Sequence, residues 1–189
     1  MMKKICLSVL LVLALLFTGC ASAPAEVPKV ENFVFDDHGY ACAIAPYGCT
    51  LEDLEKALDT MMTDRGSNPV TNPFTYESYI TSAPVTMLGL DGKVDAQFTE
   101  DGLLAFTFTT RFARDAAEER YADIREQFIS VFGKPAEDSD NGLGTQQVEW
   151  QDKKSGTALA LVYSDLGTTD PTFMVGVLEK WRYMDVDEW

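Results

Sequence analysis

Histidine is almost absent from this chain. Its 189 residues contain one, His38, which leaves little material for imidazole chemistry. Basic residues are also few, with 15 Lys and Arg against 30 Asp and Glu, and the formal net charge is −15. This excess of acid argues against nucleic acid as a partner, because its phosphates would be repelled. With 46% hydrophobic residues, the composition is that of a globular protein and argues against a disordered one.

The apolar run near the amino terminus is too short to cross a bilayer. It extends from Ile5 to Phe17, broken only by Ser8, and Lys3 and Lys4 precede it. A membrane-spanning helix needs about 20 apolar residues, whereas a positive start followed by a shorter apolar core is typical of a secretion signal. The sequence therefore predicts that residues 1–19 form a leader.

The segment Phe17-Thr18-Gly19-Cys20 follows this apolar core. It resembles the bacterial lipobox, in which a bulky apolar residue and two small ones precede a cysteine, with Phe17 in place of the usual Leu. The resemblance implies a bacterial lipoprotein whose Cys20 thiol is diacylated and whose leader is cleaved before that residue. Two other interpretations stay open: an ordinary secretion signal cut near residues 21–23, and an unprocessed anchor helix.

Residues 20–29 are predicted to form the lipidated cysteine and a flexible tether, because this stretch is small, proline-containing and without apolar period. Anionic headgroups repel so acidic a protein, so the acyl chains must hold it at the membrane. Ala21, rather than Asp, follows the cysteine. That resembles an outer-membrane destination in a two-membrane bacterium, and in a one-membrane bacterium the same anchor implies the cell surface.

Two cysteines, Cys42 and Cys49, fall in the predicted folded part. Outside the cytosol they can form a disulfide, or they can remain as two buried apolar thiols, and the sequence leaves both interpretations open. No His or third Cys lies near them, which argues against a metal site. We therefore expect neither a metal nor a cofactor.

A capping pattern starts the first predicted helix. Thr50 is followed three residues later by Asp53, a variant of the capping box, and Gly66 can end the helix. The apolar positions at helical spacing are Leu51, Leu54, Leu58 and Met61. Short strands are predicted before this helix at 33–35 and 40–45, and three strands after it at 83–88, 93–98 and 103–110, joined by turns at Asp91-Gly92 and Asp101-Gly102.

The second half repeats this order. Asp115 is the predicted cap and Gly133 the predicted end of a longer helix, followed by an acidic loop over 137–144. The apolar stripe of the helix is Ala117, Tyr121, Ile124, Phe128 and Val131, and strands are predicted at 146–151, 158–163 and 173–179.

Strands separated by so few residues cannot be parallel, because a parallel crossover needs a dozen residues or more. We therefore predict an α+β fold in which helices cover one face of an antiparallel sheet or sheets. Two tandem helix-plus-three-strand units are expected, at residues 30–113 and 114–189, together forming one compact body.

This layout resembles the β-lactamase-inhibitor-protein fold, which places two such units in succession. Gly48-Cys49-Thr50-Leu51-Glu52-Asp53-Leu54 also resembles the helix start of the small outer-membrane-assembly lipoproteins of the SmpA/OmlA type, and Phe132-Gly133-Lys134-Pro135 resembles their helix end. The resemblance covers about residues 40–180 and implies the layout. It does not carry an inhibitory or assembly activity, because a fold does not fix a function.

The sequence selects no catalytic group. His38 lies in Asp36-Asp37-His38-Gly39, a predicted surface turn, and no Ser or Cys is marked as its partner. Asp138 and Asp140, with Glu149 further on, partly resemble a calcium loop, but Leu143 occupies the position of the sharp-turn glycine. Pairs of carboxylates are numerous, and spacing distinguishes none of them.

Aromatic residues continue beyond the last predicted strand, with Trp181, Tyr183 and Trp189 among acidic neighbours. They can pack on the sheet, or they can contact a partner, because Trp and Tyr dominate interface energetics. The sequence thus favours a non-enzymatic binding or scaffold module at the bacterial cell envelope, attached to the membrane by its lipid and bound to a protein partner. The alternative is an envelope hydrolase or sugar-active enzyme that uses acidic residues.

Overall fold

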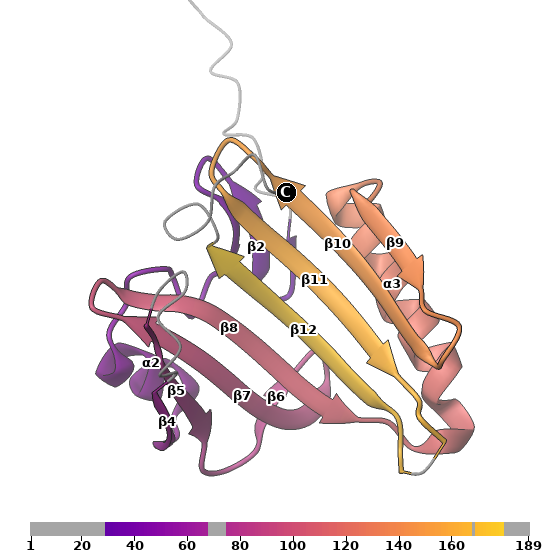
Figure 1. Cartoon of the computed structure of the whole chain (residues 1–189), viewed down its shortest axis with the longest axis horizontal. Helices are drawn as coiled ribbons and strands as arrows, with labels where there is room; N and C mark the ends of the chain where they lie inside the picture. Colours follow the sequence, from indigo (N-terminus) through magenta and orange to yellow (C-terminus); the bar gives the residue numbers. More distant parts are fainter. Residues whose placement is uncertain (1–28, 68–74, 168, 180–189) are drawn as a thin grey trace, which may run out of the picture.

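The structure, a computed structural model, describes residues 29–67, 75–167 and 169–179. Within these ranges the chain forms two α-helices, one 3-10 turn and a series of strands (Figure 1). In chain order they are β1 (Lys29–Val30), β2 (Phe33–Asp36), β3 (Gly39–Cys42), α2 (Leu51–Leu58), β4 (Met62–Ser67), β5 (Glu77–Thr81), β6 (Val85–Met87), β7 (Leu90–Thr99), β8 (Gly102–Arg111), η1 (Arg114–Ala116), α3 (Ala117–Phe132), β9 (Glu137–Asp140), β10 (Thr145–Asp152), β11 (Thr157–Ser164) and β12 (Thr172–Glu179).

Most strands belong to one antiparallel sheet of nine strands. Its order is β4-β5-β7-β8-β12-β11-β10-β9, with β6 paired to β7 alone, and β1-β2-β3 form a separate small sheet. The strands after α2 thus fill one half of the large sheet and those after α3 fill the other. The two halves join where β8 pairs with β12. The predicted α+β class is confirmed, whereas the duplication of one unit stays a prediction.

The first helix is shorter than its sequence predicts. The capping box is confirmed, since the Thr50 hydroxyl accepts the Asp53 N–H and the Asp53 side chain accepts the Thr50 N–H. The helix ends at Leu58 rather than near Gly66, because Asp59 takes a left-handed conformation and the Glu55 carboxylate accepts the Met62 N–H at 2.6 Å. That bond holds the first amide of β4 beside the helix.

The number of strands also differs from the prediction. Five strands follow α2 in the described residues, because β4 and β5 occupy polar stretches without a clear alternation. The Asp101-Gly102 turn is confirmed between β7 and β8, with Gly102 at φ 101°. The predicted turn at Asp91-Gly92 is wrong: both residues lie inside β7, and the chain turns at Leu88-Gly89 instead.

The second half deviates at its beginning and after its helix. Asp115 is not a cap, because η1 precedes α3 and no side chain caps the helix. Gly133 ends α3 as predicted, at φ 77°. The predicted acidic loop is wrong for Glu137–Asp140, which pair with β10 as the edge strand β9, so that four strands follow α3.

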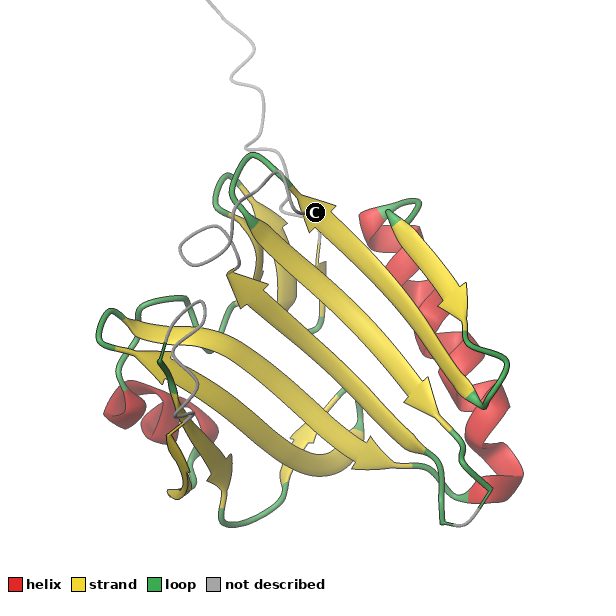
Figure 2. Cartoon of the chain, viewed as in Figure 1, coloured by secondary structure: helices red, strands yellow, loops and turns green. Residues whose placement is uncertain are grey.

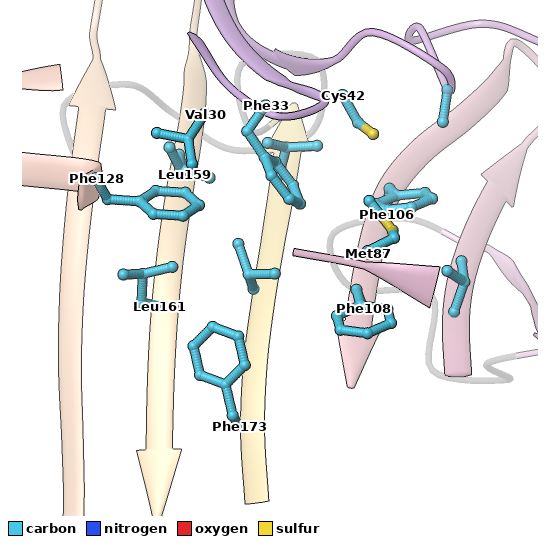
Figure 3. Close-up of a cluster of buried hydrophobic side chains, with 14 of the residues drawn as sticks. Val30, Phe33, Cys42, Met87, Phe106, Phe108, Phe128, Leu159, Leu161 and Phe173 are labelled. Carbon is cyan, nitrogen blue, oxygen red and sulfur yellow. The ribbon is translucent and has the colours of Figure 1, made fainter. Parts of the chain in front are cut away.

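The hydrophobic core lies on one face of the large sheet, between that face and α2, α3 and the small sheet. Figure 3 shows Phe33 of the small sheet and Phe128 of α3 directed toward the same group of side chains as Leu159, Leu161 and Phe173. The rings of Phe33 and Phe128 lie 5.8 Å apart. Trp150 is buried as well, and its indole N–H donates to the carbonyl of Gly133 at 2.9 Å.

The hairpin of β2 and β3 packs closely against the start of β11. The Tyr40 N–H donates to the Thr157 hydroxyl at 2.8 Å. A Cβ at Gly39 would lie 2.0 Å from the Ser155 Oγ and 2.2 Å from the Thr157 Oγ1. Only glycine allows this approach, so position 39 holds the small sheet against the large one.

We predict that Gly39→Ala destabilises the protein far more than Gly66→Ala. Both glycines have positive φ, 92° and 94°, so the backbone cost of about 1–3 kcal/mol is common to the two variants. A Cβ at position 66 meets open space, whereas a Cβ at position 39 overlaps its neighbours and lowers the free energy of unfolding by about 1–3 kcal/mol more. Chemical denaturation of both variants measures the difference in the free energy of unfolding. Equal losses of stability would contradict the close packing of Gly39 against Ser155 and Thr157.

Candidate functional site

The two faces of the large sheet differ in what covers them. Residues on one face belong to the core, under both helices and the small sheet. Alternate residues of the same strands point the other way, because successive side chains of a strand lie on opposite faces. Both helices lie behind the strands in the view of Figure 2, so the viewer faces this second side. We call it the open face.

The open face carries an ordered array across its three central strands. The strand register aligns the side chains of β11, β12 and β8 in three rows. In that strand order the rows are Ala158–Leu178–Ala105, Ala160–Gly176–Thr107 and Val162–Met174–Thr109. The array is apolar or small throughout, and it contains no aromatic ring. It is therefore an array of aliphatic and hydroxyl groups. Its first row is largely buried, since Ala158 is 4% and Ala105 9% exposed, whereas the other two rows are partly exposed.

The middle row has no side chain at its centre. Gly176 stands at its centre, where a Cβ would lie 2.8 Å from the Thr107 Oγ1 and 2.9 Å from the Phe106 carbonyl oxygen. Leu178 and Met174 stand on either side of it along β12. The Thr107 side chain and the β8 backbone thus occupy the space that a side chain at position 176 would need, and only glycine fits between the two larger apolar residues.

Polar side chains flank the array on β10. Glu149 faces Ala160 of β11, and the residue is 8% exposed. Its two oxygens accept amide N–H groups from Gln151 at 2.9 Å and Gln147 at 3.3 Å. These hydrogen bonds compensate part of the cost of burying a charge. The three side chains form a fixed polar border.

Basic side chains gather at the other border, near the start of β12. A hollow of about 480 Å³ there is lined by the cations Arg65, Lys93 and Arg111 and by the carboxylates Asp91 and Asp95, together with Thr109 and Thr172 among others. The three cations differ in the ion pairs and hydrogen bonds that they make. Arg65 pairs with Asp95 at 2.6 Å. The Lys93 ammonium donates to the carbonyl oxygens of Thr81 and Ser82 at 2.9 and 2.6 Å.

Arg111 is the available cation of this group. It is exposed, and it makes no ion pair within the described part of the chain. Thr172 of β12 lies opposite it in the register, so its guanidinium belongs to the end of the array. In a chain of net charge −15, this end is the part of the open face suited to an anion.

The structure brings His38 and Ser155 to one hollow, which the sequence could not show. This hollow of about 630 Å³ lies between the β2–β3 turn and the β10–β11 turn, and Asp36 and Lys154 also line it. Ser155 Oγ lies 2.8 Å from the Thr157 hydroxyl and 3.4 Å from the Asp152 carbonyl oxygen. Its hydroxyl therefore makes structural hydrogen bonds within the β10–β11 turn. His38 occupies an exposed turn, as predicted.

The carboxyl groups with shifted pKa values act as structural acceptors. The Thr50 hydroxyl lowers the pKa of Asp53, and the Ser155 side chain lowers that of Asp152. The Gly167 N–H and the Arg114 guanidinium lower the pKa of Asp165. A general acid needs the opposite shift, because it must hold its proton near neutral pH. These three carboxylates are therefore poorly suited to act as general acids.

The acidic residues that partly resemble a calcium loop are not brought together. Asp138 pairs with Val148 on the core side of β10, where Arg125 of α3 donates to its carboxylate. Glu149 is the next residue of β10 and points to the open face. Across the described ranges, no group of three or more His, Cys, Asp and Glu is arranged to hold a metal ion.

The two cysteines of the folded part are free thiols in the structure. Cys42 is fully buried at the end of β3, and burial raises its pKa to about 12. Cys49 is half-buried just before α2, and burial raises its pKa as well. Both groups are therefore weak nucleophiles in the folded protein, since the thiolate is the reactive form.

Several residues proposed from the sequence lie outside the described residues. They are Cys20 of the lipobox and the aromatic residues Trp181, Tyr183 and Trp189. Among the helices that are described, none combines the length and the apolar character required to traverse a bilayer. The lipid anchor and the aromatic carboxyl terminus consequently stay predictions.

We predict that alkylation distinguishes the two thiols. In the native chain at pH 8, iodoacetamide should label Cys49 faster than Cys42, because Cys42 is fully buried and has the pKa of about 12. Mass spectrometry of tryptic peptides measures both sites over time. Unfolding without reductant should expose both to equal labelling, and failure of both to react under those conditions would show a disulfide instead.

A scan against protein-family models and a search of curated proteins both found no match. No activity, substrate or partner is thus available to transfer from another protein.

Proposed function

We propose that this chain is a lipid-anchored protein of the bacterial cell envelope that binds a protein partner through its open face, without catalysis. The observation that carries the binding role is the three-row array, an apolar surface on the side of the sheet away from the core. The pattern at Phe17-Thr18-Gly19-Cys20 supports the anchor. Each part of the proposal has its own experiment.

The dimensions of the array suit the centre of a protein interface. Strands lie about 4.8 Å apart and alternate residues about 6.8 Å apart, so the array and its two flanking strands cover roughly 20 Å by 14 Å. Stable interfaces bury about 800 Å² on each partner. A bound protein would therefore contact the array and also its polar borders on β10 and β7. Apolar centres with polar rims are the usual anatomy of such contacts.

The borders define the chemistry of the partner. A segment that fits the array must be apolar where it meets Leu178, Gly176 and Met174. It must carry a carboxylate where it approaches Arg111, because an uncompensated cation would lose its hydration without gaining a partner. The open face thus fits an extended protein segment that is apolar along its length and acidic at one end.

The proposed anchor predicts a simple dependence on one residue. Expressed in a bacterium with a lipoprotein pathway and labelled with an alkyne palmitate, the chain should incorporate label and sediment with membranes. Cys20→Ala should abolish the labelling, and the matched variant Cys49→Ala should retain it. Acylation of the Cys20→Ala variant, or an intact and unacylated amino terminus in the unmodified chain, would contradict the anchor.

The proposed binding face predicts a position-dependent crosslink. A photoreactive phenylalanine analogue at Ala160 lies in the middle row, and one at Ala122 lies on the exposed side of α3. Irradiation of cells should give a discrete adduct with a second protein from position 160 alone. The adduct should disappear in an Arg111→Glu background, since the partner is expected to place a carboxylate there.

Three outcomes would contradict the binding face: equal adducts from both positions, no adduct from position 160, or an adduct insensitive to Arg111→Glu. Ala160→Arg offers an independent measurement, since it places a charged side chain in the middle row of the array. Ala122→Arg is its control, because it makes the same change on a helix surface. Binding of the identified protein should fall at least tenfold for the first variant alone.

A further inference from the structure

Two leucines are exposed at one end of the large sheet. Leu143, in the turn between β9 and β10, is 77% exposed, and Leu166, in the loop between β11 and β12, is 68% exposed. Among the large apolar side chains of the described residues, Met61 after α2 is the one other that is exposed. Apolar residues exposed singly need no explanation, whereas those that gather at one place mark a contact site.

The strand register brings the two leucines together. Beyond the last pair of the β10–β11 ladder, the Asp165 N–H donates to the Gly144 carbonyl at 2.7 Å, in the register of the pairs before it. Continued by one more step, this register sets Leu143 opposite Leu166. A Cβ at Gly144 would lie 2.0 Å from the Asp165 carbonyl oxygen, so glycine is what lets the two turns approach. We call these two residues the leucine pair.

Hydrogen bonds hold both turns that carry the leucine pair. The Asn141 side chain accepts the Leu143 N–H at 2.8 Å. The Asp165 carboxylate accepts the Gly167 N–H at 2.8 Å, and the Arg114 guanidinium lies 3.0 Å from each of its oxygens. Both leucines therefore project from turns that are already ordered. A partner that covers them does not have to order these turns, which favours binding.

The charges beside the leucine pair limit what can cover it. Asp140 ends β9 just before the first turn, and Asp170 lies in the second. Both are exposed, and neither forms an ion pair within the described ranges. Anionic headgroups would be repelled here, and contact between the same ends of two copies would bring four carboxylates together. A protein surface with basic groups beside an apolar pocket has the complementary charge.

The leucine pair also lies far from the small sheet, in which the described residues begin. The β2–β3 hairpin packs on the start of β11, and the pair lies beyond the end of that strand, about 27 Å away over eight residues (Figure 1). In the proposed lipoprotein the anchor precedes the small sheet. The pair is then at the end of the sheet away from the entry of the chain, a position suited to a second envelope protein.

We propose that the leucine pair inserts into an apolar pocket, bordered by Lys or Arg side chains, on a protein partner. This contact is separate from the array of the open face. Its apolar part comes from Leu143 and Leu166, and its charged part from the carboxylates of Asp140 and Asp170. Only the choice of an envelope protein rests on the proposed anchor.

Two positions of equal exposure test the contact in cells. A photoreactive phenylalanine analogue replacing Leu166 should give a discrete adduct with another protein, and one replacing Met61 should not, although both residues are 68% exposed. Adding Leu143→Ser should reduce the yield from position 166 at least tenfold. Equal adducts from both positions, no adduct from position 166, or an adduct with lipid or with a second copy would overturn the proposal.

Matched variants then test the chemistry with the purified partner. Leu143→Ser should weaken binding at least tenfold, as expected for one leucine lost from an interface, and Met61→Ser should leave it unchanged. Asp140→Asn should weaken binding two- to fivefold and Asp36→Asn should not. Each of these carboxylates accepts the N–H two residues on, at 2.8 and 2.7 Å, and asparagine keeps that acceptor. Equal effects of the two asparagine variants would contradict the basic border of the pocket.

A stability measurement separates contact from packing. Leu143→Ser and Leu166→Ser should each leave the Tm of the purified full chain within about 1 °C, because exposed side chains contribute little to folding. A fall of several degrees would show that the leucines support the fold and would overturn the proposal. The adduct at position 166 is scored independently of the one at position 160, so failure of the open face and failure of this contact are distinguishable.

Discussion

The pairing of β8 with β12 is the contact on which the rest of the structure depends. Without it the strands after α2 and those after α3 would be two smaller sheets, each with an additional exposed edge. The pairing aligns Phe106 with Val177 and Phe108 with Val175 on the core face. It also aligns Thr107 with Gly176 and Thr109 with Met174 on the open face. One register therefore creates both the shared core and the array proposed to bind a ligand, because the side-chain period of a strand is two.

Local signals in the sequence predicted the features that depend on a few neighbouring residues. The capping box of Thr50 and Asp53, the end of α3 at Gly133 and the turn at Asp101-Gly102 each follow from the chemistry of adjacent positions. The missed strands depend on partners far away in the chain. β4 is largely exposed and polar, and it is a strand because β5 pairs with it. The Asp91-Gly92 pair is absorbed into β7 for a similar reason, since β6 and β8 provide its hydrogen bonds.

The open face could not be assigned from the sequence, although its residues are visible in the printed strands. The alternation in Leu104-Ala105-Phe106-Thr107-Phe108-Thr109 indicates one buried side and one wetter side. It does not show that Ala105 will lie beside Leu178, nor that Arg111 will complete the end of the array. These contacts form between β8 and β12, which come from different halves of the chain. The same holds for Ser155, which meets the His38 turn only because the small sheet seats on β11.

The edges of the large sheet explain why association should use its open face. At one edge, β9 exposes all four of its residues, three of them acidic, and like charges in a row oppose the addition of another strand. At the other edge, β4 is interrupted by an irregularity between Asp64 and Gly66. A charged edge and an irregular edge both disfavour growth of the sheet. The partly exposed rows of the apolar array then offer another described surface for association, and the exposed cation Arg111 at their end limits what can cover them.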